Sequence, residues 1–222
     1  MNEFASYYSK NVIVEISGTT PVHGLLIAAG IDLVVLLREQ KYYYIPMSHV
    51  HRVTLDAKAN QEDYSHSHGI SFMEQEEPLG LMLQKAIDLF VDISVSSHKP
   101  VSGYLREIKS DYLILQSPVY RTIFVSLNHL KWLIPYSSHY MPFGQSAETV
   151  RTPMSKDLES VNKFEDLFTF ESGNKVVINF GSASEQIGII NAVGSGIVDL
   201  TDASGNNGMY PLSHIKTLFV PK

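Results

Sequence analysis

Three histidines stand in one repeated context and are the first candidates for chemistry. They occur in Ser48-His49-Val50, Asn128-His129-Leu130 and Ser213-His214-Ile215, each time after a strand-like segment. An imidazole can act as a general base or contact a ligand. However, no acidic residue recurs at a fixed offset to orient the rings, and the neighbouring Ser and Asn side chains commonly bond to turn backbone. We interpret these histidines as structural turn residues that could contact a partner, and we expect no catalytic residues.

Metal binding has weaker candidates. The pairs His49/His51 and His66/His68 would place two imidazoles on the same side of a strand. A stable zinc site needs three or four ligands, and no further ligand follows at a matching spacing. The sequence contains no cysteine, which excludes disulfides, thiolate metal sites and cysteine nucleophiles. We therefore predict that the protein binds no metal and no cofactor.

Motifs of other enzyme classes are missing from the sequence. It contains neither a serine nucleophile elbow nor a phosphate-binding or dinucleotide-binding glycine loop. The cluster Glu74, Glu76 and Glu77 precedes a predicted helix, where negative charge complements the helix dipole. The 222 residues carry 17 Lys and Arg against 23 Asp and Glu, a net charge of −6, and 44% are hydrophobic. This composition predicts a globular protein and argues against general nucleic-acid binding.

An internal repeat organises these residues. Gly24, Gly103 and Gly188 each follow a β-rich run, and a small turn-forming residue (Asp32, Asp111 or Gly196) follows each glycine at the same distance. The spacing from each glycine to the histidine of its copy differs by at most one residue. Three coincident landmarks predict three copies of one structural unit.

The residue pattern of each copy predicts a short helix followed by five antiparallel strands. In the predicted strands, apolar residues alternate with polar ones, and turn-forming residues separate the strands. The predicted strands are 12–17, 22–29, 32–38, 41–46 and 50–55; 90–96, 103–108, 111–117, 120–126 and 130–134; and 175–180, 186–192, 196–201, 207–211 and 215–220. The predicted helices are 3–8, 78–89 and 156–168. We expect each copy to curl and close on itself, which would hide its own edges.

The predicted organisation is mostly β, with three small barrels separated by two connectors. A first helix-plus-barrel unit covers 1–56, a linker covers 57–77, a second unit covers 78–136, a linker covers 137–153, and a third unit covers 154–222.

The unit looks like the Sm fold, a relative of the SH3-type small barrel. Three such copies resemble the N-terminal part of spore-coat protein B of endospore-forming bacilli, over nearly the whole sequence. The best matches are Gly103-Tyr104-Leu105, Asp111-Tyr112-Leu113-Ile114-Leu115, His129-Leu130-Lys131 and His214-Ile215-Lys216. Two features of the family have no counterpart here: the Gly-Gly-Pro-Glu loop between the first two strands, and the Ser-, Lys- and Arg-rich tail of its long form.

The resemblance implies a non-enzymatic structural protein of the spore coat. Such a protein is made in the cytoplasm of the mother cell, is deposited on the spore rather than secreted, and has other spore-coat proteins as partners. Residues 1–8 contain no secretory signal pattern, and we expect no membrane insertion. Self-association is left open. One alternative is an Sm-like RNA-binding protein, which the net charge disfavours. Another is an enzyme or metal protein with a site between units.

Overall fold

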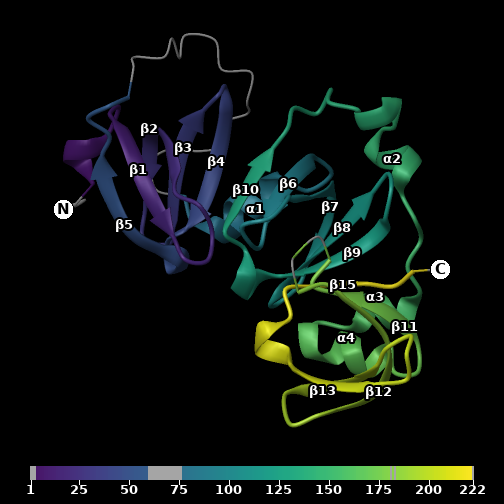
Figure 1. Ribbon diagram of the computed structural model, residues 1–222. Coiled ribbons are helices and arrows are strands. Elements are labelled where there is room, and N and C mark those ends of the chain that lie inside the picture. Colours follow the sequence, from purple (N-terminus) through teal and green to yellow (C-terminus); the bar gives the residue numbers. More distant parts are fainter. Residues whose placement is uncertain (1–3, 60–76, 181, 183, 222) are drawn as a thin grey trace. The chain divides into compact units, whose positions relative to one another are not determined.

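The computed structural model describes residues 4–59, 77–180, 182 and 184–221 (Figure 1). It is mostly β, as predicted, and the strand pairs in it are antiparallel. The predicted histidine pair His66/His68 and the carboxylates Glu74 and Glu76 lie outside the described residues.

The same order of elements recurs three times along the chain. The first copy comprises η1 (Ala5–Tyr7), β1 (Asn11–Ile16), β2 (Val22–Ala29), β3 (Leu33–Arg38), β4 (Lys41–Pro46), η2 (Met47–His49) and β5 (Val50–Leu55). The second comprises α1 (Leu79–Lys85), β6 (Phe90–Ser94), β7 (Val101–Ile108), β8 (Tyr112–Ser117), β9 (Arg121–Ser126), η3 (Leu127–His129) and β10 (Trp132–Pro135).

The third copy follows a segment with short helices of its own. These are η4 (Pro142–Gly144) and α2 (Ala147–Val150), which lie within the predicted linker 137–153. The copy continues with α3 (Lys156–Ser160), α4 (Phe164–Phe170), β11 (Lys175–Ile178), β12 (Gln186–Gly194), β13 (Ile197–Thr201), β14 (Asn207–Pro211), η5 (Leu212–His214) and β15 (Thr217–Phe219).

The chain divides into two compact units that cut across the middle copy. One unit comprises 1–100 and 130–140, with the strand order β6-β10-β4-β3-β2-β1-β5. The other comprises 101–129 and 141–222, with the order β14-β13-β12-β11-β15-β9-β8-β7. The boundaries of these compact units differ from those of the three helix-plus-barrel units and two linkers predicted from the repeat. The predicted division into units and linkers therefore remains a prediction.

The three repeated glycines lie in the second strand of each copy, close to the backbone of the third strand. A Cβ atom at Gly24 would lie 2.8 Å from the carbonyl oxygen of Leu37, and one at Gly188 would lie 2.8 Å from that of Thr201. At Gly103 the corresponding distance, to Gln116, is 3.0 Å. The pairing register shifts just beyond the glycine in each copy, which indicates a β-bulge. Glycine is therefore required for close strand approach at a bend.

Strand edges are hidden differently from the prediction. In the first and third copies, the first strand pairs with both the second and the fifth strand. Among the described residues, no pair joins the fourth and fifth strands of one copy. Instead β4 pairs with β10, and β9 pairs with β15. The expectation that each copy closes on itself is wrong: in the first two copies the fourth strand pairs with the fifth strand of the next copy, and in the third copy β14 pairs with β13 alone among the described residues.

Two helices also differ from their predicted bounds. The predicted helix 78–89 ends at Lys85 as α1. The predicted helix 156–168 is two helices, α3 and α4, because the backbone is extended at Val161 and Lys163. Figure 1 shows α4 beside β11–β13, and its residues Phe164, Leu167 and Phe168 belong to the hydrophobic cluster of those strands.

Candidate functional site at the junctions between copies

The two strand junctions share one register. In the first, Tyr44 of β4 pairs with Leu133 of β10. In the second, Phe124 of β9 pairs with Leu218 of β15. In both cases the first residue stands five positions before the histidine of its own copy, and its partner stands four positions after the next one. The repeat therefore specifies how neighbouring copies join as well as how each copy folds.

A carboxylate from one copy caps the helix of the next at both junctions. The Leu79 amide, at the start of α1, donates to the two carboxylate oxygens of Asp32 at 3.2 and 3.1 Å. The Phe164 amide, at the start of α4, donates to Asp111 Oδ1 at 2.8 Å. These bonds satisfy amides that the helices themselves leave unpaired. In the sequence, Asp32 and Asp111 indicated only turns.

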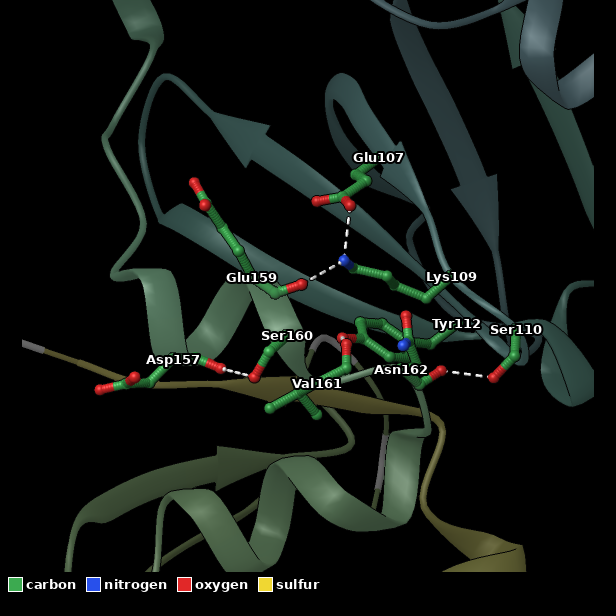
Figure 2. Close-up of polar contacts among 9 residues, drawn as sticks. All are labelled: Glu107, Lys109, Ser110, Tyr112, Asp157, Glu159, Ser160, Val161 and Asn162. Carbon is green, nitrogen blue, oxygen red and sulfur yellow. Dashed lines mark hydrogen bonds and ion pairs between the residues drawn. The ribbon is translucent and has the colours of Figure 1, made fainter.

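The second junction also accounts for the break between α3 and α4 (Figure 2). The Tyr112 hydroxyl donates to the Val161 carbonyl at 2.7 Å, and the Ser110 amide and hydroxyl both donate to the Asn162 carbonyl. Lys109 Nζ donates to the Glu159 carbonyl at 2.8 Å and pairs with Glu107 at 2.5 Å. The backbone carbonyls at the end of α3 are thus bonded to the preceding copy instead of continuing a helix.

Apolar contacts accompany these polar ones. Tyr112, Ile114 and Phe124 of the second copy belong to the same buried cluster as Phe164 and Leu218 of the third. Burial, followed by the nearby carboxylates of Glu107 and Asp111, raises the pKa of the Tyr112 phenol above its usual range. Tyr112 therefore joins the copies as a neutral hydrogen-bond donor.

A polar cluster lies at the first junction. Lys41 Nζ of the first copy donates to the Tyr136 hydroxyl at 3.1 Å, and this hydroxyl donates to Asp92 Oδ2 at 2.6 Å. Burial, with the Asp92 carboxylate as a second cause, raises the pKa of Tyr136. The Tyr43 and Trp132 rings pack edge to face with centroids 5.3 Å apart. No pattern in the sequence indicated this cluster.

The repeated histidines lie beside the junctions. Lys131 Nζ, from the second copy, donates to His49 Nδ1 and to Ser17 Oγ, both at 3.1 Å. His129 Nε2 donates to the Ser213 carbonyl of the third copy at 3.0 Å. His214 is exposed and lines a cavity of about 440 Å³ together with His129 and Lys216. Two of the three histidines therefore bond to the next copy.

Of the two histidine pairs considered for metal binding, only His49/His51 lies within the described residues. Within the residues that the structure describes, no group of three or more His, Cys, Asp or Glu side chains could hold a metal ion. The same residues include no helix that is long and apolar enough to cross a membrane.

The fold and these junctions define a class: a tandem-repeat antiparallel β protein whose copies join edge to edge. The chain belongs to the YwrJ family. It is 30% identical over 230 residues to the uncharacterized protein YwrJ of Bacillus subtilis (strain 168), and the match covers the whole of both chains. The family model described as the YwrJ third domain matches residues 163–218, which lie within the predicted third unit.

Proposed function

We propose that the chain is a non-enzymatic structural component of the bacterial spore coat that assembles through protein–protein contacts of its repeated units. One observation carries the proposal: the same strand junction, with its carboxylate cap, forms twice in one chain. A surface that repeatedly joins copies is the feature expected of an assembly protein, and tandem copies multiply the contacts made with other coat proteins.

We further propose that each copy is a small barrel of the Sm or SH3-like type. The order of helix and five strands, the bulge after each repeated glycine, and the 3₁₀ turn before each fifth strand support this assignment. In the first two copies the edge formed by the fourth strand is covered by the fifth strand of the copy that follows.

The proposed location is the spore coat, reached from the mother-cell cytoplasm without secretion. The support is the resemblance to spore-coat protein B, whose motifs include His129-Leu130-Lys131 and Asp111-Tyr112-Leu113. Lys131 and Asp111 both make junction contacts here. The proposal thus assigns a joining role to residues that carry the resemblance.

The test is the position of a fluorescent fusion in a sporulating bacillus. The full chain should appear only after sporulation begins, gather around the forespore, and remain with purified spores after salt washing. The same fluorophore without the chain is the control. A fusion that is present during vegetative growth and stays diffuse in sporulating cells would refute the proposal.

The alternative is an Sm-like RNA-binding protein, and the cavity lined by His129, His214 and Lys216 is the observation that favours it. Single-stranded RNA titrated against the purified chain separates the two functions. We expect no saturable binding at 150 mM salt. Binding that weakens steeply with salt would indicate phosphate contacts and support the alternative.

A further inference from the structure

The strand orders of the two units end in edges that have neighbours on one side. Among the described residues, β5 pairs with β1 alone, and β14 pairs with β13 alone. These edges are the two halves of the junction that forms twice within the chain. β14 is the fourth strand of the last copy, and β5 is the fifth strand of the first.

The residues at these edges occupy the positions that pair at the internal junctions. Five positions before the histidines stand Tyr44 and Phe124, which are 0% and 2% exposed. The equivalent residue of the third copy, Met209, is 76% exposed. A large apolar side chain is thus uncovered where the other two copies are covered by a fifth strand.

The opposite half of the junction shows a similar difference. Leu133 and Leu218, four positions after their histidines, are fully buried. Val53, the equivalent residue of β5, is half-buried and packs against the hydrophobic cluster of the first copy. Phe124 inserts into the cluster of the copy that follows it. Met209 would do the same beside Val53.

We propose that β14 of one chain pairs antiparallel with β5 of a second copy of this chain. The interface continues the established junction, so the register follows from it: Met209 opposite Val53, Tyr210 opposite Arg52, and Gly208 opposite Thr54. The partner is a second copy of this chain because the contact continues the junction by which the fourth strand of one copy pairs with the fifth strand of the next. Paired edges also exchange hydrogen bonds that exposed edges lack.

This contact is weaker than the internal junctions. The third copy has Gly196 at the position of Asp32 and Asp111, so no carboxylate there can cap a helix of the next molecule. Association therefore depends on protein concentration, and its head-to-tail geometry allows either a closed ring or an open chain. The inference rests on the proposed function in one respect: both assume that the repeated units serve to assemble the protein.

The test is sedimentation velocity of the purified full chain over a range of concentrations. The wild type should form dimers or larger species as its concentration rises. Met209→Glu places a charge in the interface and should abolish association. Met141→Glu is the matched control, because Met141 is 51% exposed and lies away from both edges in sequence; it should associate like the wild type.

A mixing experiment tests the head-to-tail geometry. Thr54→Glu blocks β5 and leaves β14 intact, whereas Met209→Glu does the reverse. Each variant alone should be monomeric, and an equimolar mixture should form a one-to-one dimer. A monomeric wild type, or a Met209→Glu chain that associates like the wild type, would overturn the inference. A chain that associates but never reaches the coat would refute only the proposed function.

Discussion

Removal of the carboxylate at the second junction tests whether one copy supports the helix of the next. In Asp111→Ala, the Phe164 amide loses its 2.8 Å bond, while the bond from the Leu127 amide to the carbonyl of residue 111 can remain. Loss of a helix-capping side chain typically costs about 1 kcal/mol. Opening of α4 should therefore become ~5-fold more frequent, and its amides should exchange ~5-fold faster.

Hydrogen exchange with mass spectrometry measures this effect on a peptide that covers 164–170. Asp111→Asn keeps an acceptor oxygen and should restore most of the protection. Asp157→Ala is the control, because Asp157 lies in α3 but contributes only its carbonyl to the contacts of Figure 2. Unchanged exchange of α4 in Asp111→Ala, or an equal effect of Asp157→Ala, would refute the capping role.

Three further changes test other parts of the junctions and the repeat. Gly24→Ala forces a Cβ against the Leu37 carbonyl and should lower the free energy of unfolding, measured by urea titration, by about 1–3 kcal/mol. Gly80→Ala is the control: Gly80 lies in a helix with open space around it, so this change should raise the free energy of unfolding by about 0.5–1 kcal/mol. Leu218→Ala empties a fully buried junction position and should cost about 2–5 kcal/mol, measured the same way; a cost below 1 kcal/mol would contradict the burial. Because the pKa of Tyr112 is raised in the folded state, the unfolded chain loses this proton first, so stability should fall as pH rises above about 10, by at most about 1.4 kcal/mol per pH unit. Tyr112→Phe should remove this part of the alkaline loss, measured by denaturation between pH 9 and 11.

The strands could be predicted from the sequence because their signal is local. β3 and β8 read as apolar runs that begin after Asp32 and Asp111, and both begin within a residue or two of the predicted positions. The repeated glycines stood out in the sequence as landmarks of the repeat, but their close approach to the neighbouring strand came from the structure alone.

The junctions could not be predicted because their partners are distant in sequence. The break before α4 depends on Tyr112, which is 49 residues from Val161, and nothing in the sequence of 156–168 signals it. Alternating apolar residues likewise show that a strand has two faces, but they do not show which strand covers its edge. The prediction of self-closed copies failed at this point.

The third copy shows what a junction loses when its fourth strand has a neighbour on one side only, as β14 has among the described residues. Within the chain, the connecting segments hold neighbouring copies at an effective concentration of about 1 mM or more, so even weak edges pair. At the third copy, Gly196 removes the cap and Met209 replaces an aromatic ring, which leaves mainly strand pairing. A substitution at Gly196 would not restore the cap, because the backbone there has a φ of +75°, which residues with a side chain rarely adopt, whereas neither Asp32 nor Asp111 has a positive φ. Gly196→Asp should therefore strain this turn and leave the association of the full chain no stronger than that of the wild type in sedimentation velocity, and stronger association would contradict this reasoning.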